Sequence, residues 1–118
     1  MIGGIGVGYV FFLGPWREKD WRQLIGEVRK VYDGKLTYAA NWYEDFEKIT
    51  FWDELAFIGV PAYFPLSDKQ QPSVEELKLG WETHLDAIEK VHRQFKKPVL
   101  CTEVGYRRTT DDAVRPWE

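Results

Sequence analysis

The sequence predicts an α/β domain built around a parallel sheet. Segments typical of strands alternate with segments of helical spacing, and a near-continuous apolar run spans residues 56–66. Polar side chains also gather where the expected strands end. Alternation of this kind is typical of βα units, and a long apolar run is typical of a strand that is buried on both faces.

Composition and charge are typical of a folded chain and do not indicate a polyanion as its partner. The 118 residues suffice for one small domain, and 44% hydrophobic with 30% charged residues is typical of a globular chain. The formal net charge is −3 and no basic block occurs, so neither a nucleic acid nor a membrane surface is indicated as a partner. Aromatic residues make up 16% of the chain. Such residues mostly fill cores, although their flat faces also suit sugar rings.

Residues 1–15 form an atypical apolar, glycine-rich N-terminal segment. No charged side chain occurs before Arg17, so the basic start of a secretory signal is missing. The segment is also shorter than the roughly 20 apolar residues that span a bilayer. We expect a weak buried strand here, and nothing in the sequence assigns a cellular location.

The next segments predict a helix, a strand and a loop. Helical spacing of apolar residues begins near Trp16 and ends at Asp33-Gly34, where glycine suits the position after a helix. Residues 35–42 are β-prone, and residues 43–55 indicate a loop with one or two short helical turns.

The second half of the chain carries the clearest signals. Residues 56–66 predict a strand with Pro61 near its end or at a bulge, because proline cannot donate to the ladder. Ser73 and Glu76 form a capping box that opens a long helix, and residues 97–106 predict the following strand. The expected apolar stripe of that helix comprises Val74, Leu77, Trp81, Leu85, Ile88, Val91 and Phe95.

Cysteine and histidine give no sign of a metal site, and no cofactor is implied. Cys101 is the single cysteine, and in an apolar strand we expect a buried, inert thiol. His84 and His92 lie in one expected helix without the spacing of a zinc motif, so a surface role is favoured.

Polar or aromatic residues end each expected strand after the first. They are Asn41 and Trp42, then Tyr63, then Glu103 with Tyr106. In α/β barrels the carboxyl ends of the strands build the active site, so Glu103 would face the mouth of such a barrel. The residues alone explain Glu103 equally well as an exposed carboxylate paired with Arg107 or Arg108.

Three segments together resemble glycoside hydrolase family 113, a β-mannanase-like family of retaining enzymes with a TIM-barrel fold. They are RKVYDGKLTYAANWYED, FWDELAFIGVPAYFPLS and KPVLCTEVGYR. The resemblance covers about residues 16–118. A full barrel has roughly 250 residues, so the resemblance implies a partial (β/α)8 barrel. This part would be the C-terminal half, from about strand four or five to strand seven, lacking the last strand.

The resemblance also implies roles for individual residues. In the family, the glutamate of the TEVGY-like motif is the catalytic nucleophile, and this position corresponds to Glu103. A tyrosine at the end of the sixth strand lies beside the nucleophile and corresponds to Tyr63. The further expected substrate-binding residues are Asn41, Trp42, Tyr106 and Trp117.

The second catalytic carboxyl group is missing from its expected place. The family's acid/base glutamate precedes the helix that begins near Trp16, but the first carboxylate here is Glu18, in the helix itself. The resemblance therefore predicts a fragment of a retaining glycoside hydrolase for β-linked mannan-type or related hexose polysaccharide, with the nucleophile but not the acid/base. We expect this fragment to be inactive alone.

Two other classes of function stay open. A non-catalytic carbohydrate-binding remnant would keep Trp42, Tyr63 and Trp117 as a stacking surface. An unrelated α/β domain would bind a protein partner through its apolar face. A half-barrel would also have open sheet edges, which favour self-association or support by another chain.

Overall fold

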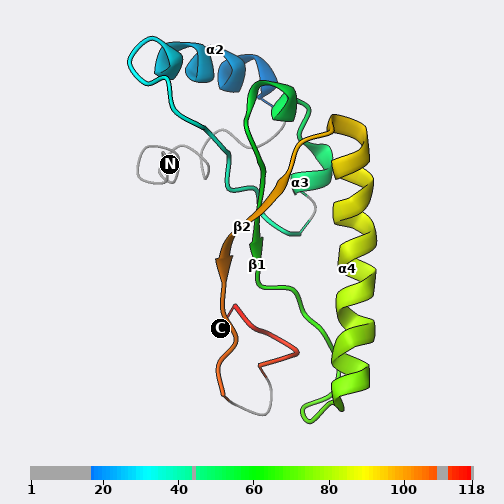
Figure 1. The fold of residues 1–118 in the computed structure, drawn as a ribbon. Coiled ribbons are helices and arrows are strands. Elements are labelled where there is room, and N and C mark those ends of the chain that lie inside the picture. The colour runs from blue at the N-terminus through cyan, green and yellow to red at the C-terminus, as the bar shows by residue number, and fades with distance from the viewer. Residues whose placement is uncertain (1–16, 44, 109–111, 118) are drawn as a thin grey trace.

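The computed structural model describes residues 17–43, 45–108 and 112–117. Figure 1 shows the order of the elements along the chain. They are α2 (Glu18–Arg29), α3 (Asp45–Lys48), the 3-10 helix η1 (Phe51–Glu54), β1 (Ile58–Ala62), α4 (Val74–Phe95) and β2 (Val99–Val104). The weak strand expected in residues 1–15 lies outside the described residues.

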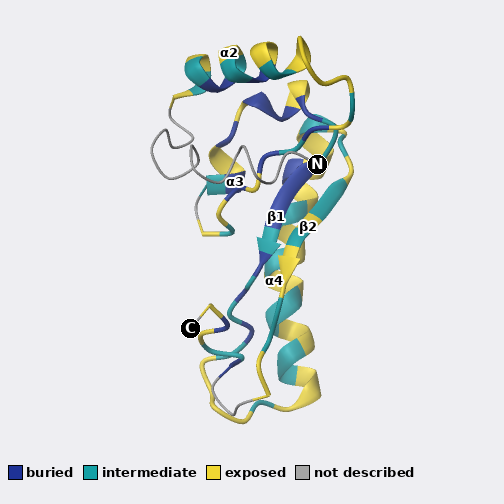
Figure 2. Cartoon of the chain, turned by 90° about the vertical axis from the view of Figure 1, so that its left-hand side faces the viewer, coloured by how far each residue is buried: buried dark blue, intermediate teal, exposed yellow. Residues whose placement is uncertain are grey.

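The two strands form a parallel pair, and α4 connects them as the crossover helix. This confirms the predicted parallel βα arrangement in the second half of the chain. Helix α4 runs alongside the strands (Figure 1) and lies behind them when the molecule is turned by 90° (Figure 2). Strand β1 is buried almost throughout, whereas β2 is half exposed.

Cys101, expected to be buried, is exposed on β2. The expectation was wrong because an apolar sequence alone does not tell an inner strand from an outer one. Strand β1 has β2 on one side and the bridge at Ala39 on the other, whereas β2 pairs only with β1 among the described residues.

The strand expected at residues 35–42 is reduced to an isolated parallel bridge between Ala39 and Gly59. Burial alternates along the segment, which is typical of an extended backbone. Beside the bridge, the Thr37 hydroxyl donates to the Phe57 carbonyl at 2.9 Å. Backbone bonds from Ala56 to Leu36 and from Ala40 to Gly59 also join the two segments.

Aromatic residues build the core beneath α2. The Trp21 ring lies 4.8 Å from Tyr38 and 5.8 Å from Phe51, centroid to centroid. The Trp52 indole is fully buried and donates to the Phe46 carbonyl at 3.0 Å. Four aromatic side chains are thus part of the core: Trp21, Tyr38, Phe51 and Trp52. Helix α2 itself ends at Arg29, a few residues before the expected stop.

The capping box of α4 is confirmed. The Ser73 hydroxyl accepts from the Glu76 backbone N–H at 3.2 Å, and the Glu76 carboxylate accepts from the Ser73 backbone N–H at 2.8 Å. Both bonds satisfy N–H groups that the first helical turn leaves without partners.

The apolar stripe of α4 is only partly as expected. Val74 and Leu85 are exposed, by 60% and 51%, whereas His84 and Ala87 face the core. Helical spacing narrows the core face to a few adjacent positions. Which of them is buried depends on the segment that packs against the helix. The members that do pack on the core are Leu77, Trp81, Ile88, Val91 and Phe95.

Helix α4 contacts the segment after β1 through backbone. A Cβ atom on Gly80 would lie 2.0 Å from the Leu66 carbonyl oxygen. Only glycine therefore allows the helix and this segment to approach so closely. None of the described helices combines the length and apolar character that crossing a bilayer requires.

We expect Gly80→Ala to lower the free energy of unfolding by about 1–3 kcal/mol, because the new methyl group meets backbone that cannot turn aside. The matched control is Gly26→Ala in α2, where a Cβ would meet nothing within 4 Å. Helix propensity should make this control more stable by about 0.5–1 kcal/mol. Urea unfolding followed by circular dichroism measures both. Equal effects of the two substitutions would contradict the close approach at Gly80.

Candidate functional site

The candidate site lies at the carboxyl ends of β1 and β2. Because the two strands are parallel, both end at the same edge of the sheet. Glu103 is the second-last residue of β2, and Tyr63 follows directly after β1. The two expected catalytic residues therefore lie at the same edge of the sheet.

The register of the strands changes just before the site. Val60 pairs with Cys101, but the next pair is Pro61 with Glu103, so Thr102 has no partner residue. The shift coincides with Pro61, which has no N–H to donate, as the bulge prediction required. Irregularities of this kind often lie beside active sites, where they re-aim a side chain.

The shift places Glu103 and Tyr63 on one face of the sheet. Side chains alternate along a strand, so Pro61 and Tyr63 share a face. Glu103 is level with Pro61 and takes the same face, which makes it a diagonal neighbour of Tyr63. In unshifted pairing Glu103 would be level with Ala62, and its side chain would point to the opposite face.

The two side chains interact through the Tyr63 hydroxyl. Hydrogen bonding to the Glu103 carboxylate is the main cause of the raised pKa of Tyr63. Partial desolvation and the negative charge of Glu103 raise this pKa further.

Gly105 makes room for the Tyr63 ring. A Cβ atom on Gly105 would lie 3.3 Å from Cε1 and 3.8 Å from the hydroxyl oxygen of Tyr63. The first distance is tighter than ordinary van der Waals contact. The glycine of the TEVGY segment therefore lets the phenol lie against the end of β2, a role that the sequence analysis did not assign.

Tyr106 fixes the segment after β2 to the segment after β1. Its hydroxyl donates to the Phe64 carbonyl at 2.9 Å. Burial, followed by the nearby charge of Asp112, raises the pKa of Tyr106 to about 12. The Tyr106 proton is thus committed to the backbone, and Tyr63 is the tyrosine that donates to Glu103.

Trp42 and Trp117, which are 75 residues apart in sequence, meet in space. Their ring centroids lie 5.6 Å apart at an angle of 34°. Phe64 contacts Trp42 edge-on and stacks on His84, whose Nε2–H donates to the Pro65 carbonyl at 2.9 Å. We call these four rings, Trp42, Phe64, His84 and Trp117, the aromatic group. Trp117 is its exposed member, at 51%.

Asn41 lies at the same sheet edge, because it follows the bridge at Ala39. Its side-chain oxygen accepts from the Tyr43 backbone N–H at 3.1 Å, and its carbonyl accepts from Phe46 N–H at 3.3 Å. Asn41 thus shapes the turn that leads into α3, and its side chain is exposed.

Neither Arg107 nor Arg108, which follow β2, forms an ion pair with Glu103 among the described residues. Arg107 lies nearest to Asp112, with its Nε 3.6 Å from Oδ1, and none of the ion pairs among the described residues includes Glu103. No group of three or more metal-binding side chains occurs in the described part of the chain.

The comparison with family models gives the class first. The chain matches a model of glycoside hydrolases, enzymes that act on carbohydrate, and the match spans residues 8–118. The chain belongs to glycoside hydrolase family 113, whose fold is the TIM barrel. Neither curated proteins nor solved structures gave a significant match.

We expect Glu103→Gln to lower the pKa of Tyr63 toward its usual value, because the charged acceptor of the phenol is lost. Gly105→Ala should lower it in part, since the added methyl group displaces the ring. Tyrosine-labelled NMR titration measures each phenol, and Tyr63→Phe assigns the signal.

Tyr106 is the internal control for this titration, because burial sets its pKa of about 12. An unchanged pKa of Tyr63 in Glu103→Gln would contradict the hydrogen bond. Since the pKa of Tyr63 is raised by folding, the stability from this bond is complete below the unfolded phenol pKa. It is lost as the pH rises through the folded value.

Proposed function

We propose that this chain carries the nucleophile strand of a retaining, β-mannanase-like glycoside hydrolase. Glu103 is the nucleophile, and Tyr63 is its hydrogen-bond partner. The substrate class is a β-linked mannan-type or related hexose polysaccharide. In fold terms, β1 and β2 are neighbouring strands of the family's barrel, and α4 is the helix between them.

One observation carries the proposal: the register shift that brings Glu103 and Tyr63 together on a single face. A nucleophile that attacks an anomeric carbon must be ionised and held in a fixed direction. A strand end fixes the direction, and the Tyr63 phenol lies beside the carboxylate on the same face. An exposed carboxylate with no specific role would not require the Tyr63 ring to pack on Gly105. Nor would it require that ring to interact with the carboxylate.

The chain supports only half of the retaining reaction. A second carboxyl group about 5–5.5 Å from the nucleophile must protonate the leaving oxygen. The stretch that should supply it by resemblance, residues 1–16, contains neither aspartate nor glutamate. We therefore expect attack by Glu103 on a substrate whose leaving group departs without a proton, and no turnover of natural glycosides by this chain alone.

The aromatic group favours a second candidate function, carbohydrate binding without catalysis. Trp117 leaves about half of its surface exposed while its ring lies 5.6 Å from that of Trp42, tilted by 34°. A tryptophan that is held by another ring offers a flat apolar face at little cost in conformational freedom. This function requires no acid/base group.

The test uses an aryl 2-deoxy-2-fluoro-β-mannoside with a dinitrophenolate leaving group, which needs no protonation. We expect intact-mass spectrometry to detect one covalently attached fluoromannosyl group, and peptide mapping to locate it on Glu103. Tyr63→Phe should slow its formation at least about tenfold, because a hydrogen bond to a charged group is worth about 1.5–3 kcal/mol.

Two variants control this experiment. Glu103→Gln should form no adduct, whereas Glu82→Gln, at an exposed position of α4, should react like the wild type. A folded wild-type protein that forms no adduct would overturn the nucleophile proposal. In that case retardation by mannan in native gels, abolished by Trp117→Ala, would support the binding function instead.

A further inference from the structure

His84 of α4 contacts the segment that directly follows Tyr63. Its ring stacks on Phe64, with the two centroids 4.4 Å apart and an angle of 15° between the planes. Its Nε2 lies 2.9 Å from the Pro65 carbonyl oxygen, and because a carbonyl only accepts, this ring nitrogen carries the proton. One side chain thus holds the two residues that come after Tyr63, in place of the surface role expected from the sequence.

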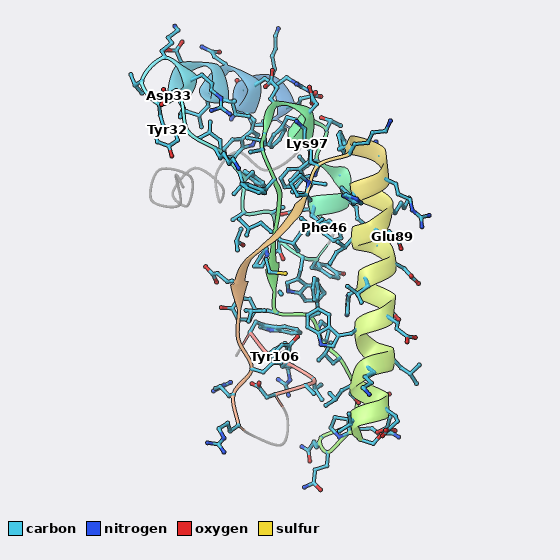
Figure 3. All side chains as sticks on the ribbon, viewed as in Figure 1. Tyr32, Asp33, Phe46, Glu89, Lys97 and Tyr106 are labelled. Carbon is cyan, nitrogen blue, oxygen red and sulfur yellow. The ribbon has the colours of Figure 1, made fainter. Side chains whose placement is uncertain are left out.

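The Phe64 position is fixed from two sides. From the helix, His84 stacks on its ring, and one turn earlier Gly80 lets α4 approach the backbone of Leu66. From the side of β2, the Tyr106 hydroxyl donates to the Phe64 carbonyl at 2.9 Å. Figure 3 shows Tyr106 beyond the end of β2, level with the N-terminal half of α4.

Tyr63 depends on this neighbour for its own position. Strand β1 ends at Ala62, so Tyr63 lies just outside the regular ladder. Burial alternates from residue 61 to residue 67, so Phe64 points to the face opposite that of Tyr63. The two residues share one planar peptide unit. A shift of Phe64 on the helix side is therefore transmitted to the phenol on the Glu103 side.

Histidine combines the two properties that this place requires. Stacking on Phe64 needs a flat ring, and reaching the Pro65 carbonyl needs a donor in the plane of that ring. Phenylalanine offers the ring without the donor, and glutamine offers a donor on a side chain of similar length without the aromatic ring. The two contacts of His84 can therefore be removed separately.

We propose that His84 is a positioning residue for the Glu103–Tyr63 pair: by holding Phe64 and Pro65, it sets the place of the Tyr63 phenol beside the Glu103 carboxylate. His84 acts through the chain and not through contact with the reacting atoms. Its effect on the reaction rests on the proposed function of Glu103, whereas its effect on the geometry of the pair does not.

The first test follows Tyr63 by NMR titration. We expect His84→Phe to lower the pKa of Tyr63 toward its usual value, because the phenol no longer keeps its place beside Glu103. His84→Gln keeps a donor for the Pro65 carbonyl and should restore part of the difference. Tyr38 is the internal control, because burial in the core beneath α2 raises its pKa to about 12.

The second test is a double-mutant cycle on adduct formation with the dinitrophenyl fluoromannoside. His84→Phe should slow this step about three- to tenfold, because a small displacement at a reacting centre lowers the rate steeply. In the Tyr63→Phe background the same substitution should change the rate by less than about twofold, because the hydroxyl through which His84 acts is already gone.

His92→Phe is the matched control, because it removes the same kind of bond from the same helix. The His92 Nδ1 lies 2.7 Å from the Lys97 carbonyl oxygen, ahead of the first residue of β2. Figure 3 shows Lys97 and Tyr106 near opposite ends of β2. This variant should leave the pKa of Tyr63 and the rate of adduct formation unchanged.

Two results would overturn the proposal. One is an unchanged pKa of Tyr63 in both His84 variants. The other is equal slowing by His84→Phe with and without the Tyr63 hydroxyl, which would make His84 a residue of general structure. A wild type that forms no adduct would instead overturn the nucleophile role of Glu103, and the titration would still decide whether His84 positions the phenol.

Discussion

The candidate site depends on a single change of register between two parallel strands. Pro61 cannot donate to the ladder, and from this residue onward β2 runs one residue ahead of its earlier pairing with β1. Because side chains alternate, this single residue decides which face Glu103 occupies. The hydrogen bond to Tyr63 and the fit of its ring over Gly105 both follow from that choice.

The remaining contacts hold the two strand ends in this relation. Tyr106 ties the segment after β2 to Phe64, and Phe64 stacks on His84 of α4. Gly80 lets the same helix lie against the backbone of Leu66. One helix, α4, therefore holds the segments that carry Tyr63 and Glu103. Tyr63 lies just after β1, and Glu103 lies near the end of β2.

Membership of glycoside hydrolase family 113 gives this geometry a chemical meaning. A retaining glycosidase divides its work between a nucleophile and an acid/base. In the proposed function, Glu103 beside the Tyr63 phenol takes the first of these tasks, and residues 1–16 contain neither aspartate nor glutamate for the second.

The sequence by itself determined what depends on local pattern: the capping box at Ser73, the parallel strands around α4, the irregularity at Pro61 and the family motif around Glu103. Only the tertiary structure decided which side chains meet. The Thr37 hydroxyl bonds to the Phe57 carbonyl, His84 rather than Leu85 packs against the core, and Cys101 is exposed on β2. Asp112, in a polar tail, became buried. Spacing could not reveal these outcomes, because each depends on the segment that packs opposite and on the register in which it arrives.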